Sequence, residues 1–304
     1  MSSITKVALA GATGNLGPAI LDGLLNAGFK VTVLTRSSST HSFPPSVTAI
    51  SVDYNSLDSL TNALKGIEAV VSALPYTGNP ADVTTNLRLV EAAAKAHVKR
   101  FIPSEFGSDT LNEKARTLPV FAGKVAVQDA LKKEAATGGM TYTVVCTGPF
   151  LDWGIMVGFI MNLKGKSISL WDGGDRVFSA TSLQAIGKAT AGVLKQLEQT
   201  KNRAVYVHET ATTLKKLATM GKHATGADGW QENVVSMDEQ LEMAWAELKK
   251  DQPNPDNFAY NFIKASIWGE GFGGHFERLD NKLLGIKEMG DAELQDLVNS
   301  LATK

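Results

Sequence analysis

The feature that most constrains this chain is a glycine-rich turn, residues 11–17 (GATGNLG). Before it, residues 6–10 (KVALA) predict a buried strand, and after it residues 18–25 (PAILDGLL) predict a helix with Pro18 in its first turn. Such a turn directs backbone N–H groups and the positive end of a helix dipole at one point, where a glycine admits a pyrophosphate closely. The sequence therefore predicts a dinucleotide site. We expect it to include Gly11, Thr13, Gly14, Asn15 and Leu16.

The second expected strand, residues 29–35 (FKVTVLT), is followed by Arg36. In dinucleotide-binding folds, a carboxylate near this place hydrogen-bonds the adenosine ribose of NAD. A guanidinium pairs instead with a 2′-phosphate through charge-assisted hydrogen bonds. Arg36 therefore favours NADPH over NADH, and a solvated loop cation is the alternative interpretation. Serines 37–39 are either further phosphate donors or a flexible loop.

Composition sets broader limits. The 304 residues, of which 43% are hydrophobic, suffice for one large domain or two closely joined ones. A net charge of −1 without a long basic run argues against binding to nucleic acid or to an anionic membrane. The single cysteine, Cys146, fits a reducing compartment and is interpreted as a buried strand thiol. No leader precedes the first expected strand, and the apolar stretch 154–163 is too short to cross a bilayer, so we expect a cytoplasmic protein.

Strands and helices alternate through the first half of the chain. This pattern predicts an α/β fold with a doubly wound parallel Rossmann sheet, whose strand carboxyl ends meet at one edge. We expect an NADP-binding domain at 1–150, to which 179–208 return with a seventh strand at 203–208. Residues 151–178 and 209–304 are expected to form a smaller, mostly helical substrate-binding lobe. The other expected strands are 47–52, 69–74, 100–103 and 142–147, and the other expected helices are 56–65, 81–97, 119–136, 184–197, 237–248 and 291–301.

Two strand ends add candidate cofactor contacts. Asp53 follows the third strand, where it is placed either to reach the adenine amino group or to cap the next helix. Ala73 and Leu74 end the fourth strand and are expected beside the nicotinamide ribose. Such contacts would lie at the edge of the sheet where ligands of parallel sheets bind.

A β-hairpin is predicted further along the chain. Residues 167–171 and 176–179 are strand-like and flank the turn 172–175 (DGGD). We interpret the two aspartates as turn formers and not as metal ligands, and the histidines show no metal-ligand spacing. No metal site is therefore expected.

The candidate catalytic residues depart from those of ordinary short-chain dehydrogenases, which carry a Tyr-x-x-x-Lys pair on a helix. The one such pair here, Tyr260 and Lys264, lies far beyond the helix in question, so Tyr260 and Phe262 are interpreted as packing residues. The expected helix has Lys124, but Val120 stands at the tyrosine position. Taken alone, Lys124 is best interpreted as a solvated cation.

Together, the motifs resemble those of the isoflavone reductase-like and NmrA-like group of atypical short-chain dehydrogenases. The resemblance rests on the glycine turn, Arg36, residues 103–107 (PSEFG), Lys124 and residues 147–150 (TGPF). It implies reduction of a small aromatic or conjugated molecule, phenylpropanoid- or polyketide-like, by NADPH with Lys124 as general acid/base. The cofactor contacts that it implies are Ser104, Glu105, Phe106, Lys124, Gly148, Pro149 and Phe150.

The motifs leave the reaction and the substrate open. Gln128 replaces the basic residue that plant members usually carry four positions after the lysine, which favours the fungal branch. The fold also resembles NmrA-type regulators that sense NAD(P) without turnover, and a redox-neutral isomerase or lyase is a third possibility. Phe150, Trp153 and Phe159 are expected to wall a substrate pocket, with core packing as the alternative, and His275 to approach from a glycine-rich flap. We expect a monomer or homodimer with a small-molecule substrate.

Overall fold

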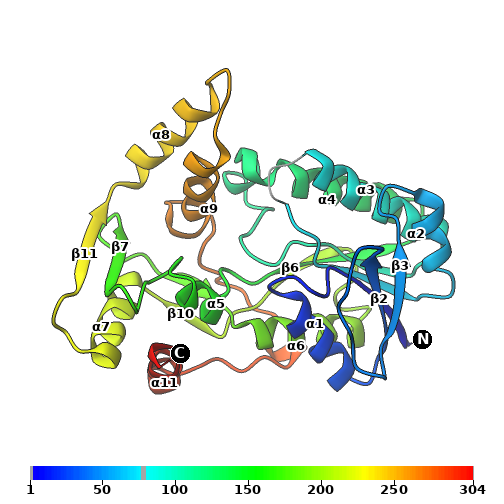
Figure 1. The fold of residues 1–304 in the computed structure, drawn as a ribbon, viewed down its shortest axis with the longest axis horizontal. Helices are drawn as coiled ribbons and strands as arrows, with labels where there is room; N and C mark the ends of the chain where they lie inside the picture. Colours follow the sequence, from blue (N-terminus) through cyan, green and yellow to red (C-terminus); the bar gives the residue numbers. More distant parts are fainter. Residues whose placement is uncertain (1–2, 77–79, 304) are drawn as a thin grey trace.

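A parallel sheet occupies the centre of the structure, which is a computed structural model describing residues 3–76 and 80–303 (Figure 1). Within these residues the sheet has seven strands in the order β3-β2-β1-β4-β5-β6-β9, and every pairing is parallel. The predicted doubly wound α/β fold is confirmed, and so is the seventh strand, which pairs with β6. The strands are β1 (Lys6–Ala10), β2 (Lys30–Arg36), β3 (Thr48–Val52), β4 (Ala69–Ser72), β5 (Arg100–Ile102), β6 (Thr141–Cys146) and β9 (Arg203–Tyr206).

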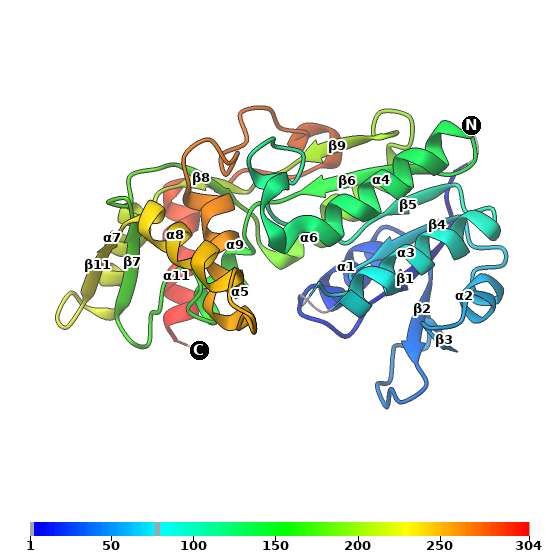
Figure 2. The same ribbon diagram turned by 90° about the horizontal axis from the view of Figure 1, so that it is seen from above.

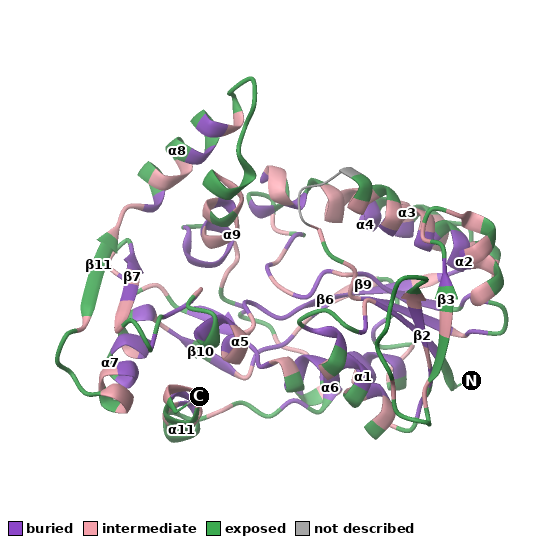
Figure 3. Cartoon of the chain, viewed as in Figure 1, coloured by how far each residue is buried: buried purple, intermediate pink, exposed green. Residues whose placement is uncertain are grey.

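Helices cover both faces of this sheet (Figure 2). One face carries α1 (Gly17–Asn26) and α6 (Leu183–Lys195), and the other carries α2 (Leu57–Ala63), α3 (Pro80–Lys95) and α4 (Ala122–Ala136). The inner strands β1, β4, β5 and β6 are mainly buried (Figure 3), because their apolar residues alternate toward the two helical layers. Helices α1 and α6 pack so closely that a Cβ on Gly187 would collide with the carbonyl group of Ala19.

Most of the remaining elements form a lobe beyond one end of the sheet (Figure 1). Its core contains Trp268, whose ring stacks on Trp171 at 6.3 Å and meets the edge of Phe178 at 5.6 Å. The domain boundaries expected from the sequence stay a prediction. The elements not yet given are α5 (Leu151–Met156), β7 (Ser167–Trp171), β8 (Phe178–Ala180), β10 (Thr210–Thr212), α7 (Leu214–Thr225), β11 (Gln231–Val235), α8 (Met237–Leu248), α9 (Ala259–Trp268), α10 (Asn281–Leu284), α11 (Asp291–Ala302) and the 3-10 turns Ala115–Thr117, Pro119–Phe121 and Pro255–Asn257.

The predicted hairpin at 167–179 is wrong. The expected turn exists, since Asp172, Gly173 and Gly174 all have positive φ. However, β7 pairs in parallel with β11, and β8 pairs antiparallel with β10. Each strand thus takes a partner from a distant part of the chain. Among the described residues, no helix is both long and apolar enough to cross a membrane.

Candidate active site

The glycine turn lies at the carboxyl end of β1, and its glycines have different roles. Gly11 has φ +86°, and a Cβ there would lie 2.5 Å from the carbonyl oxygen of Ala73. A Cβ on Gly17 would collide with the carbonyl oxygen of Gly11. A Cβ on Gly14 would meet only that oxygen, at an ordinary 3.6 Å. Gly11 and Gly17 are therefore required by the chain itself, whereas the space beside Gly14 is open.

The open side of Gly14 faces a cavity of about 530 Å³. Helix α1 begins beside it without a side-chain cap and without an acidic residue in its first turn, so the positive end of its dipole is not neutralised. Many of the candidate residues predicted from the sequence line this cavity, and their contacts with cofactor or substrate stay predictions. They are Gly14, Asn15, Leu16, Ala73, Leu74, Ser104, Phe106, Lys124, Gly148, Pro149, Phe150, Trp153 and Phe159.

Lys124 stands in the first turn of α4, with its side chain 14% exposed at the cavity wall. Its ammonium group donates a hydrogen bond to the backbone oxygen of Glu105 at 2.5 Å and lies 4.0 Å from the Glu105 carboxylate. The Phe121 ring centroid is 5.7 Å away. Burial lowers the pKa of Lys124, and the negative charge of Glu105 opposes this shift. Lys124 is therefore not a freely solvated surface cation.

Comparison with known proteins adds the family. A model of the NmrA-like family matches residues 3–238. The chain belongs to this family. Oxidoreductase aprR of Aspergillus flavus is 35% identical over 252 residues, which cover 81% of this chain and 82% of the relative. Oxidoreductase poxI of Penicillium oxalicum is 29% identical over 297 residues, which cover 93% and 90%.

A solved complex of leucoanthocyanidin reductase with NADPH from Vitis vinifera has the same fold as this NmrA-like protein. The two structures superpose with a TM-score of 0.78 at 18% identity, covering 98% of this chain and 100% of the other. The resemblance predicted from the sequence motifs is thus confirmed at the level of family and fold.

Arg36 and Asp53 lie at the same edge of the sheet but do not line the cavity, and both are exposed. The Asp53 carboxylate accepts a hydrogen bond from the backbone of Asn55 at 2.8 Å. Helix α2 is capped by Ser56, whose hydroxyl oxygen accepts from the backbone N–H of Ser59 at 3.2 Å. The prediction of Asp53 as the helix cap is therefore wrong. Its adenine contact, and the pairing of Arg36 with a 2′-phosphate, stay predictions.

Four other predicted contact residues lie outside the cavity lining. Gly11 supports the turn from behind, and Thr13 is exposed. The Glu105 carboxylate is 1% exposed, so any contact of this residue with a cofactor is limited to its backbone. His275 stacks on His208, with ring centroids 6.4 Å apart, and does not line the cavity. Its loop packs beside β8 through a hydrogen bond from Ser179 to the backbone oxygen of Gly274, and the expected approach of His275 to the substrate stays a prediction.

Tyr260 is one of the cavity-lining residues that the sequence interpretation missed, with Tyr76 and Phe121. It is 56% exposed and lines the cavity, with its ring 6.2 Å from that of Phe159, so the packing assignment is wrong for Tyr260. It is confirmed for the fully buried Phe262. Tyr260, Ile263 and Ile267 line the cavity at the three- and four-residue spacing of one helix face. That spacing within α9 was the available signal.

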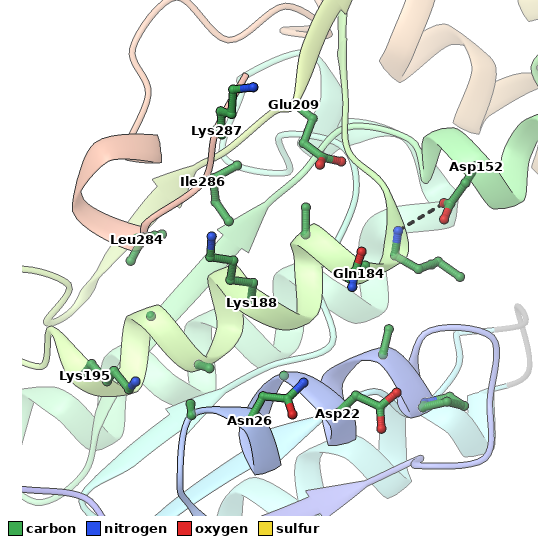
Figure 4. Close-up of a pocket in the computed structure, with 18 of the residues that line it drawn as sticks. Asp22, Asn26, Asp152, Gln184, Lys188, Lys195, Glu209, Leu284, Ile286 and Lys287 are labelled. Atoms are coloured by element: carbon green, nitrogen blue, oxygen red, sulfur yellow. Dashed lines mark hydrogen bonds between the residues drawn. The ribbon is translucent and has the colours of Figure 1, made fainter. Parts of the chain in front are cut away.

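A second, larger cavity of about 920 Å³ lies between α1 and α6 (Figure 4). Its lining mixes polar and apolar residues, and it includes Asp22 and Asn26 from α1 and Lys188 and Lys195 from α6. Lys124 is not part of it, so we place the candidate active site in the smaller cavity. Across the described ranges, no group of three or more His, Cys, Asp or Glu side chains is gathered as metal ligands would be.

Proposed function

We propose that this protein is an NADPH-dependent reductase of a small aromatic or conjugated molecule, with Lys124 as general acid/base. One observation carries the proposal. Among the described residues that line the cavity, Lys124 is the only charged side chain, and it stands between the glycine turn and an apolar wall. A proton donor or acceptor is thus placed where a bound dinucleotide and an apolar substrate would meet.

The residues present fit NADPH. The open space beside Gly14 and the uncapped start of α1 suit a pyrophosphate, and Arg36 suits the 2′-phosphate. NADPH, when bound, supplies the hydride. The leucoanthocyanidin reductase of the same fold is named as a complex with NADPH, and the fungal relatives are named oxidoreductases, which supports this cofactor and reaction class.

Lys124 is suited to proton exchange. One of its three N–H groups is taken by the Glu105 carbonyl oxygen, which leaves the others for a substrate oxygen. Its lowered pKa brings it closer to the range in which an amine both gives and accepts protons. Lys124 either removes a phenolic proton so that a leaving group departs, or protonates the enolate of a conjugated ketone. In the first route hydride adds to the electron-poor carbon that the leaving group vacates. In the second route the enolate forms because hydride has already added to the conjugated ketone, and its protonation completes the reduction.

The remaining wall of the cavity indicates the substrate class. Aromatic side chains from several parts of the chain line it, namely Phe121, Phe150, Trp153, Phe159 and Tyr260. Aromatic and apolar linings with a few polar groups favour flat, largely uncharged ligands. We therefore place phenylpropanoid- and polyketide-like molecules first.

The test is a hydride-transfer assay with NADPH across conjugated ketones, benzylic ethers and quinones. Lys124→Met should lower kcat/KM at least ~100-fold, the usual effect of losing a general acid or base, with NADPH binding retained. Lys132→Met, on the same helix with a side chain 45% exposed, is the matched control and should leave turnover unchanged. Unchanged turnover in Lys124→Met would refute the site. NADPH binding without turnover of any class would favour a nucleotide-sensing regulator.

A further inference from the structure

Behind Lys124 lies a buried polar cluster formed by Glu105, Thr110 and Gln128. Thr110 donates a hydrogen bond to Oε2 of Glu105 at 2.8 Å, and the Gln128 amide donates to Oε1 at 3.0 Å. The same amide lies 2.6 Å from the Thr110 hydroxyl oxygen. All three side chains are almost completely buried. The carboxylate is thus fixed in orientation by two neutral donors.

Neither of those donors neutralises the charge. A buried carboxylate is costly unless it is paired with a cation or well hydrogen-bonded. In the described part of the chain, the only cationic side chain within 4.0 Å of Glu105 is Lys124. With a neutral glutamine at position 128, Lys124 is the cation in the described part of the chain that the charge of Glu105 stabilises.

The other titratable groups near Lys124 are neutral. Cys146, on β6, has a pKa raised well above its ordinary value, chiefly by burial, so it stays a thiol. Tyr76, which lines the same cavity, has a raised pKa for the same reason and stays a phenol. Among the residues that the structure describes, Glu105 is therefore the one negative charge that faces Lys124.

We propose that Glu105 is a positioning residue that stabilises the protonated form of Lys124 and aims its ammonium group into the cavity. The backbone oxygen of Glu105 fixes the position of the ammonium group at 2.5 Å, and the carboxylate stabilises its charge from 4.0 Å. At that separation the carboxylate attracts the ammonium without forming a contact ion pair that would draw it away from a substrate. Thr110 and Gln128 maintain the separation, because they occupy both carboxylate oxygens.

This inference deepens the proposed function, but its test does not use turnover. The unprotonated form of a lysine reacts with acetic anhydride, so the pH dependence of acetylation, followed by mass spectrometry, reports the pKa of Lys124 in the intact protein. In Glu105→Gln, which keeps the size and hydrogen-bonding groups of the side chain, we expect that pKa to fall by about one unit or more. Lys132 in the same sample should not change.

The matched control is Asp129→Asn, which removes one negative charge from the same helix at a side chain 60% exposed. It should leave the pKa of Lys124 unchanged. If Glu105→Gln does not fold, Glu105→Asp serves instead. The shorter side chain keeps the negative charge but moves it away from the ammonium group of Lys124, so the pKa of Lys124 must fall by a smaller amount. An unchanged or raised pKa of Lys124 in a folded Glu105 variant overturns the proposal.

The two proposals fail separately. A shifted pKa with no turnover of any substrate class supports the positioning role and refutes the reductase. If turnover depends on Lys124 but the pKa of Lys124 is unchanged in the Glu105 variants, the reductase is supported and the positioning role of Glu105 is refuted.

Discussion

The different roles of Gly11 and Gly14 give a prediction that separates folding from cofactor binding. In Gly14→Ala the new methyl group meets only one protein atom, at an ordinary 3.6 Å, and the backbone has no positive φ. The free energy of unfolding should therefore change by less than about 1 kcal/mol. The methyl group projects into the space proposed for the pyrophosphate, so NADPH affinity should fall at least about tenfold, or ~1.4 kcal/mol.

Gly11→Ala should instead lower the stability of the fold. Its φ of +86° costs an alanine about 1–2 kcal/mol, and its Cβ, 2.5 Å from the Ala73 oxygen, adds about 1–3 kcal/mol of overpacking. A total of roughly 2–5 kcal/mol lowers Tm by roughly 4–20 °C in a chain of this size. Thermal unfolding measures the Tm of each glycine variant, and fluorescence titration measures its affinity for NADPH. Wild-type NADPH affinity in a normally stable Gly14→Ala protein would refute the placement of the pyrophosphate.

Two further predictions concern charge. Arg36→Ala should lower the affinity for NADPH by roughly 10–100-fold, the equivalent of one charge-assisted contact, and should have little effect on the affinity for NADH. Equal losses of affinity in fluorescence titrations with both cofactors would contradict the assignment. The pKa of His208 is lowered chiefly by burial, an effect that Glu288 opposes. The contribution of neutral His208 to stability is therefore complete at pH values above the ordinary histidine pKa of 6.5, and it is lost as the pH falls below that value. Tm measured against pH should fall less steeply below 6.5 in His208→Gln than in the wild type, and parallel curves would contradict the reasoning.

The strands of the central sheet were predictable because the signal for each is local. Residues 7–10 and 69–72 are short runs of apolar or small residues, as expected for strands buried on both faces. The hairpin prediction failed for the opposite reason. The sequence of 172–175 determines a turn, but the partners of β7 and β8 are β11 and β10, which are more than 25 residues away in the chain.

The same distinction holds at the candidate site. The glycine turn and Lys124 are evident from motifs, whereas the setting of Lys124 depends on which side chain of a distant segment meets it. In the sequence, Gln128 is notable only because it stands where plant members of the family usually carry a basic residue. In the structure it is buried and donates to Glu105, a contact across 23 positions that no local pattern predicts. Tyr260 reaches the cavity only because α9 lies across it.

The position of β9 has a consequence for how the chain folds as it is synthesised. Strand β6 ends at residue 146, but its outer neighbour begins only at residue 203, after α5, two strands of the lobe and α6 have been made. Until then, β6 is an open edge whose backbone groups are available for pairing with another chain. A fragment ending near residue 150 would also lack α6, the helix that covers α1. The nucleotide-binding half is therefore not an independent unit of synthesis, and the ribosome must complete about two thirds of the chain before its sheet closes.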